Sequence, residues 1–118
     1  MPPFDLCERT FEFSLNILKL WQNMTKTRGF PRPLANQLLR AGTSVGANME
    51  EGRAGQSKAD FISKYSIARK EAREAMYWLR MFVASKLLNE CDGRPLIKEA
   101  DELVSILTAI IKKSKGLT

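Results

Sequence analysis

The chain has 118 residues, 44% of them apolar, which is about the length of one folded domain with a real hydrophobic core. It carries 19 Lys or Arg against 13 Asp or Glu and no histidine, so its formal charge is +6. The missing histidine removes the commonest general base and the commonest metal ligand, which excludes much enzyme chemistry. We therefore expect one basic domain that spans residues 1–118.

The cysteines and the apolar stretches give expectations about the compartment. Cys7 and Cys91 lie at opposite ends of the chain without a CxxC spacing, so we expect reduced, packed thiols and neither a zinc site nor a disulfide framework. No stretch reaches the roughly 18 unbroken apolar residues of a membrane helix, and the first residues lack a basic leader region. These features predict a cytoplasmic protein with no membrane partner.

Two amphipathic helices are expected in the first half of the chain. Apolar residues recur at steps of three and four over residues 6–24, and the segment 29–33 ends this helix because its prolines lack amide donors. A second helix starts at Pro33. Its apolar row is Leu34, Leu38, Ala41, Val45 and Met49. Gly42 and Gly46 lie within it, and their cost of about 1 kcal/mol each in a helix indicates close approach of another backbone.

Two further helices follow in the second half. Ser57 with Asp60 resembles a capping box and starts a third helix over residues 58–89. Its heptad seam is Phe61, Tyr65, Ala68, Ala72, Ala75, Leu79 and Phe82. After the break at residues 92–94, Pro95 starts a fourth helix with the seam Leu96, Ala100, Leu103, Leu107 and Ile110. Short connections and no strand-like alternation predict an all-α fold, an antiparallel up-down four-helix bundle.

The common active-site patterns are missing from this sequence. A di-iron bundle needs Glu-x-x-His pairs, a serine nucleophile usually needs an imidazole base, and no phosphate-binding glycine loop is present. The carboxylates, such as Glu71 and Glu74, fall on rows that are expected to be solvated. We predict no catalytic residue, no metal site and no cofactor, and therefore no enzyme.

The basic excess lies in the middle of the chain, because residues 28–58 carry +3 and residues 59–90 carry +2. The candidate binding residues are Arg69, Lys70, Arg73, Tyr77 and Arg80. From Lys70 onward they form one row of the third helix, with Arg69 beside it. The row is compatible with nucleic-acid binding, in which Tyr77 stacks on a base, and with a subunit interface. It is also compatible with a plain solvated face, where Lys70 pairs with Glu74 four residues later.

Three segments carry a family resemblance: RAGTSVGANMEEG at residues 40–52, SKADF at 57–61 and IARKEA at 67–72. The chain resembles the bacterial four-helix bundle proteins encoded in intervening sequences of 23S ribosomal RNA genes. The resemblance covers nearly the full chain and implies a ring-shaped homo-oligomer, a pentamer, with no established reaction. The accessory proteins of diversity-generating retroelements are similar in fold and assemble with a reverse transcriptase and nucleic acid.

A polar row lies within the first of these segments. The residues of this family motif are Arg40, Ser44, Asn48, Glu51 and Gly52. The first four follow one face of the second helix, and polar groups in a packed row must satisfy one another. We expect Asn48 and Glu51 to organise the turn between the second and third helices, with a binding role as the alternative.

The sequence thus gives two hypotheses of different classes. The first is a cytoplasmic, non-enzymatic homo-oligomer, a pentameric ring, whose basic surface binds RNA or DNA without strong sequence preference. The alternative is a scaffold whose ring presents a groove to a protein partner, with no nucleic-acid ligand.

Overall fold

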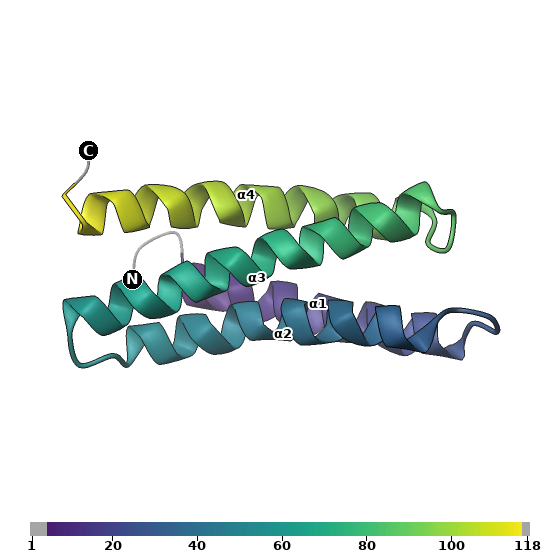
Figure 1. The fold of residues 1–118 in the computed structure, drawn as a ribbon, viewed down its shortest axis with the longest axis horizontal. Coiled ribbons are helices and arrows are strands. Elements are labelled where there is room, and N and C mark those ends of the chain that lie inside the picture. Colours follow the sequence, from purple (N-terminus) through teal and green to yellow (C-terminus); the bar gives the residue numbers. More distant parts are fainter. Residues whose placement is uncertain (1–4, 117–118) are drawn as a thin grey trace.

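The part of the chain that the structure describes folds into four antiparallel α-helices (Figure 1). The structure, a computed structural model, describes residues 5–116. The helices are α1 (Leu6–Lys26), α2 (Arg32–Arg53), α3 (Lys58–Ala84) and α4 (Glu90–Ser114). Helix α1 packs against α2, α2 against α3 and α3 against α4, while α4 meets α1 over a smaller area. The predicted all-α, antiparallel up-down four-helix bundle is confirmed.

Side-chain caps explain where three of the helices begin. Asp5, Ser57 and Asn89 precede α1, α3 and α4, and each accepts a hydrogen bond from the backbone amide three residues later, at 3.1, 3.1 and 2.8 Å. These bonds satisfy amides that the first turn of a helix leaves without partners. The predicted cap at Ser57 is confirmed. Helix α2 instead has Pro33 in its first turn, where the fixed φ of proline suits a helix start.

The boundary between the third and fourth helices differs from the prediction. Helix α3 ends at Ala84 rather than five residues later, and α4 begins at Glu90 rather than at Pro95. Gly93 is buried, and a Cβ atom there would lie 2.4 Å from Val83 Cγ2. The glycine therefore permits packing of α4 on α3 and does not mark a turn. Pro95 lies inside α4, close to its start.

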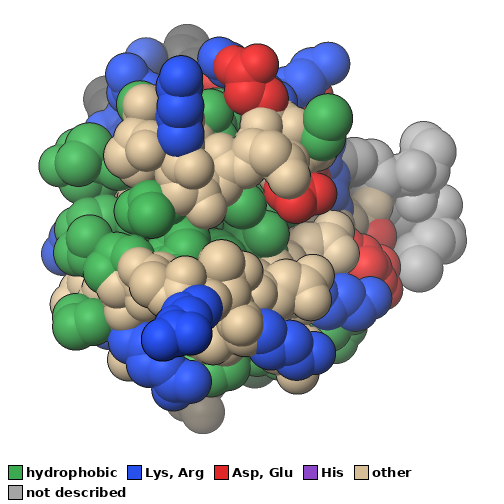
Figure 2. All heavy atoms as spheres, turned by 90° about the vertical axis from the view of Figure 1, so that its right-hand side faces the viewer, with side chains coloured by type: hydrophobic (Ala, Val, Ile, Leu, Met, Phe, Trp, Pro, Cys, Tyr) green, Lys and Arg blue, Asp and Glu red, His purple; other side chains and the backbone are tan. Residues whose placement is uncertain are grey.

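Both the α1–α2 and the α3–α4 connections lie at one end of an elongated bundle that measures 47 × 25 × 23 Å. Figure 2 views this end and shows apolar side chains at the surface, with Lys and Arg side chains above and below them. The α3–α4 connection contains Lys86, whose φ of 65° falls in the left-handed region that glycine usually occupies.

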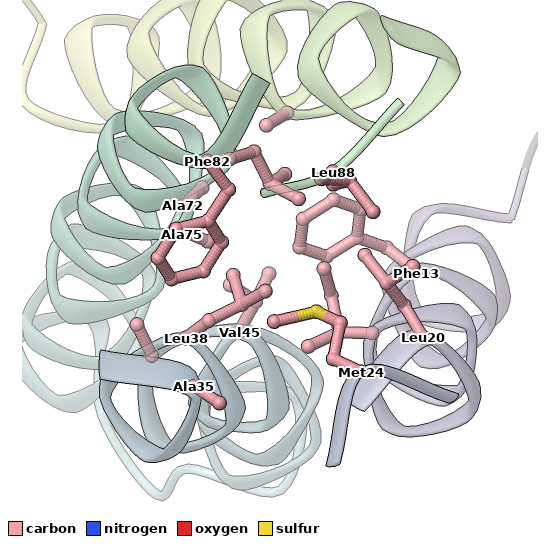
Figure 3. Packing of buried hydrophobic residues seen from close by; sticks show 14 of the residues in the cluster. Phe13, Leu20, Met24, Ala35, Leu38, Val45, Ala72, Ala75, Phe82 and Leu88 are labelled. Atoms are coloured by element: carbon pink, nitrogen blue, oxygen red, sulfur yellow. The ribbon is translucent and has the colours of Figure 1, made fainter. Parts of the chain in front are cut away.

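All four helices contribute to the apolar core, part of which is shown in Figure 3. Its largest enclosed side chains include Phe13, Ile17, Leu38, Met49, Leu79, Phe82, Leu103 and Leu107. The seam predicted for the third helix is buried from Tyr65 to Phe82. Leu34 is an exception to the predicted core row of α2, because it is 37% exposed while its neighbour Ala35 faces the core.

Two glycines of α2 let α1 approach closely. A Cβ atom at Gly42 would lie 2.5 Å from Ile17 Cγ2, and one at Gly46 would lie 2.8 Å from Ser14 Oγ and 3.2 Å from the Thr10 carbonyl oxygen. A larger side chain at either glycine would force this contact to open. The predicted close approach is confirmed, although at Gly42 the partner is a side chain rather than another backbone.

Ser14 of α1 forms hydrogen bonds with the backbone of α2 inside this contact. Its hydroxyl donates to the Gly42 carbonyl oxygen at 2.8 Å and accepts from the Gly46 amide at 2.9 Å. These two backbone groups are four residues apart, which is the spacing of a hydrogen-bonded pair within an α-helix, so the hydroxyl spans one turn of the continuous helix α2. A proline at Gly46 could not form this bond, because proline has no amide hydrogen.

Candidate nucleic-acid interface

The predicted row of α3 lies on its outward face, between the side that packs on α4 and the side that packs on α2. Lys70, Arg73, Tyr77 and Arg80 are exposed. Arg69 is only half-exposed and turns toward α4, where its Nη1 lies 3.5 Å from the Thr108 hydroxyl oxygen. The structure therefore places four of the five candidate residues together on one surface and assigns Arg69 to the α3–α4 contact.

The cations of this row form no close ion pairs in the described part of the chain. Within residues 5–116, no carboxylate oxygen lies within 4.0 Å of the charged nitrogens of Lys70, Arg73 or Arg80. Glu74, which the solvated-face interpretation pairs with Lys70, forms its ion pair with Arg40 of α2, although the charge of Lys70 also contributes to the lowered pKa of Glu74. The charged groups of Lys70, Arg73 and Arg80 are therefore exposed without a close carboxylate in the described residues.

Tyr77 is the aromatic residue of the row, and 51% of it is exposed. Its ring packs edge-on against Trp78, with centroids 5.1 Å apart and an interplanar angle of 75°. Trp78 is itself held by a hydrogen bond of 3.2 Å from its Nε1 to a Glu74 carboxylate oxygen. Tyr77 is therefore supported from one side and still accessible to an aromatic ligand.

A groove lies at the C-terminal end of the row, between α3 and the first turns of α4. It is open to solvent, has a volume of about 600 Å³ and is lined by side chains that include Tyr77 and Arg80 of α3, Lys86 of the connection, and Glu90 and Arg94 of α4. The sequence prediction missed the contribution of α4, because it placed residues 92–94 in a turn. The Asn89 cap and the acidic first turn that follows it were the signal for an earlier start of α4.

Arg40 of the family motif links α2 to α3. Its guanidinium donates to Glu71, at 3.2 Å, and to Glu74. Glu71 is 9% exposed, so the expectation of a solvated carboxylate was wrong for this residue. The physical reason is that a pairing cation on the facing helix can compensate the burial of a charge, which a row of residues on one helix does not reveal.

The other motif residues have local partners. The Ser44 hydroxyl donates to the Arg40 carbonyl oxygen at 2.8 Å, and Asn48 Nδ2 donates to the Ser44 carbonyl oxygen at 2.9 Å. Glu51 forms an ion pair of 2.8 Å with Lys64 of α3. A Cβ atom at Gly52 would lie 2.7 Å from the Tyr65 ring, so glycine permits this contact. Glu51 and Gly52 thus join α2 to α3 near their connection, whereas the bond of Asn48 stays within α2.

The ion pair between Arg40 and Glu74 is expected to make a pH-dependent contribution to the stability of the fold. Burial opposes the ionisation of Glu74, but hydrogen bonds from Arg40 and Trp78 outweigh it and hold the pKa of Glu74 below its ordinary value. A depressed pKa stabilises the fold above the ordinary pKa, and this stability is lost as the pH falls through the folded value. We expect Glu74→Gln to remove about 0.5–1 kcal/mol of the acid-dependent change in unfolding free energy. Urea titrations from pH 7 to pH 3 measure it, and equal pH profiles for both proteins would contradict it.

The two thiols differ in their surroundings. Cys7 is buried, with its Sγ 3.9 Å from the Met49 carbonyl oxygen, and burial raises the pKa of the thiol. Burial also raises the pKa of the neighbouring Tyr65 to about 12. Cys91 is exposed, so the prediction of two packed thiols is right for Cys7 and wrong for Cys91, which lies in the outward first turn of α4.

The fold defines a class of protein, the all-α four-helix bundle. In the described part of the chain, no group of three or more Cys, Asp or Glu side chains is arranged to hold a metal ion. The family described as "23S rRNA-intervening sequence protein" matches residues 4–109. The chain therefore belongs to the 23S rRNA-intervening sequence protein family.

A solved structure of similar fold supports this assignment. It is the crystal structure of a protein of unknown function from the S23 ribosomal protein family of Bacteroides thetaiotaomicron. The two chains are 33% identical, the alignment covers 92% of this chain and 99% of the other, and the TM-score is 0.81. No curated protein matches the chain significantly. In residues 5–116, no helix is long and apolar enough to cross a membrane.

Proposed function

We propose that the protein is a non-enzymatic homo-oligomer that binds RNA or DNA without strong sequence preference. The observation that carries this proposal is the outward row of α3, where Lys70, Arg73 and Arg80 have no described carboxylate partner and surround Tyr77. Unneutralised cations release counterions from a nucleic-acid backbone when they bind its phosphates. Because every nucleotide carries the same phosphate, such contacts give affinity without reading sequence.

Self-association is supported by the outer surface of α1. Phe11 and Leu18 are exposed and lie seven residues apart on one face, with the half-exposed Leu15 between them. An apolar stripe at this spacing suits packing against another helix. The family resemblance implies a pentameric ring, and multi-angle light scattering of the purified protein measures the subunit number. The ribosomal family name of the solved relative agrees with an RNA ligand.

Salt dependence of binding tests the nucleic-acid part of the proposal. Three phosphate contacts on a single strand predict a slope of about −2 for the logarithm of affinity against the logarithm of salt concentration, at about 0.7 per contact. Fluorescence anisotropy with a labelled single-stranded oligonucleotide, from low to moderate salt, gives this slope. No binding at low salt, or binding that does not weaken as salt rises, would contradict the proposal.

A protein-interaction scaffold is the second candidate function. It is supported by the apolar side chains at the surface of the bundle end shown in Figure 2. Met81, near the end of α3, and Leu87, in the α3–α4 connection, are exposed. Binding of a protein partner through these residues would be insensitive to salt, because apolar burial rather than charge would provide the affinity.

A further inference from the structure

The groove between α3 and α4 has the dimensions of a site for a small ligand. Its volume of about 600 Å³ lies within the range of roughly 300–1,000 Å³ that is typical of small-molecule sites. Tyr77 and Met81 of α3 and Ile97 of α4 provide apolar surface. Arg80, Lys86 and Arg94 provide cations on the same groove. The groove therefore combines apolar walls with cations, which suits a ligand that is both flat and anionic.

The charges around the groove favour an anion. Arg80 and Lys86 line it and have no carboxylate partner in the described chain, whereas Arg94 is paired with Glu90 at 2.9 Å. The guanidinium of Arg80 and the ammonium of Lys86 are therefore available to donate hydrogen bonds to phosphate oxygens, for which both groups are well suited.

Lys86 holds a backbone conformation that would be easier for glycine. It follows the C-cap of α3 with a φ of 65°, and its amide donates to the Val83 carbonyl oxygen at 3.1 Å. Glycine is the usual residue at this position because a Cβ atom disfavours the left-handed region. The chain therefore keeps a cation beside the groove at a position where helix termination alone would favour glycine.

We propose that this groove holds one unpaired nucleotide of a bound strand, with the base stacked on Tyr77 and a phosphate contacted by Arg80 and Lys86. This inference rests on the proposed function and adds to it a preference for single strands, because a paired base is not free to enter the groove. Stacking accepts any base, since every base has a π face, so the site adds affinity without sequence preference.

Variants of Tyr77 test the stacking contact. Loss of one base–aromatic stack is expected to weaken binding of a short oligothymidylate by about 5- to 150-fold in Tyr77→Ala. Tyr77→Phe keeps the ring and should bind like the wild type. The matched control is Ile67→Ala, which removes an exposed apolar side chain of α3 outside the groove. An oligonucleotide of the same length with abasic sites should bind the wild type and Tyr77→Ala equally.

Lys86→Gly separates binding from folding. Glycine relieves the left-handed conformation, so the melting temperature should stay the same or rise, while the affinity for oligothymidylate should fall severalfold. A destabilised fold cannot produce this combination. An unchanged affinity at an unchanged or higher melting temperature would argue against a phosphate contact at Lys86.

The outcomes distinguish the groove from the wider proposal. If the wild type binds oligothymidylate in a salt-dependent way but Tyr77→Ala binds equally well, the groove assignment is wrong and the basic row still accounts for binding. If the wild type binds no nucleic acid, both proposals fail. If Tyr77→Ala loses affinity equally for oligothymidylate and for an oligoglutamate peptide, the groove accepts an acidic chain and the nucleotide assignment is overturned.

Discussion

Reversal of two charges on α3, Arg73→Glu with Arg80→Glu, is expected to weaken nucleic-acid binding by at least about 100-fold at low salt. Each arginine can form a charge-assisted contact with a phosphate, and two such contacts at about 1.5 kcal/mol or more give this factor. The new carboxylates also repel the phosphates. Both side chains are exposed, so the fold should be retained, which circular dichroism can verify.

Lys19→Glu with Lys26→Glu on α1 is the matched control for this pair. These lysines are also exposed and seven residues apart, and each double variant lowers the formal charge from +6 to +2. If binding depends on the position of the charges, only the α3 variant should lose affinity. Equal losses in both variants would mean that net charge alone attracts the ligand.

The oligomeric state of the α3 variant separates two interpretations of the row. Loss of binding by an intact oligomer supports a nucleic-acid contact at Arg73 and Arg80. Dissociation into monomers, measured by light scattering, would instead assign the row to a subunit interface, where Arg and Tyr are also enriched.

Truncation of one leucine in α2 is expected to have a large effect on stability. Leu38 is 0% exposed and packs in the core shown in Figure 3, so Leu38→Ala should lower the unfolding free energy by about 2–5 kcal/mol. This cost combines lost apolar burial with the cavity left behind. Urea unfolding followed by circular dichroism at 222 nm measures the loss at a fixed protein concentration.

Leu34→Ala is a closely matched control, because it makes the same chemical change one turn earlier in α2. Leu34 is 37% exposed, so much of its surface already contacts water, and we expect a loss of about 1 kcal/mol or less. Similar losses of unfolding free energy in the two variants would contradict the deep burial of Leu38 and the partial exposure of Leu34.

The sequence predicted the helices and their buried faces well where a periodic pattern continued over several turns. The seam from Tyr65 to Phe82 is an example, because helical geometry places residues at three- and four-residue steps on one face whatever the rest of the fold does. The end of α3 and the start of α4 were predicted less well. Gly93 suggested a turn, and only the packing of Val83 against it explains why a glycine lies inside α4.

The part of the candidate site that lies on one helix was predicted, because the helical period alone determines it. One helix is enough to place Lys70, Arg73, Tyr77 and Arg80 on a common row. Contacts between helices decide which of these residues face a partner helix, and the residue pattern of a single helix does not show such contacts. Arg69 turned toward α4, Glu71 was paired by Arg40, and the α4 side of the groove depended on the helix boundary.

The hydroxyl of Ser14 has a consequence for how α1 and α2 align. A seam of apolar side chains alone can shift by one turn and still bury a similar area, because apolar contacts have little directional preference. The hydroxyl of Ser14 meets one carbonyl and one amide of α2, and a shift would deprive this buried hydroxyl of both partners. This contact therefore favours a single register of α1 against α2 in the first helical hairpin.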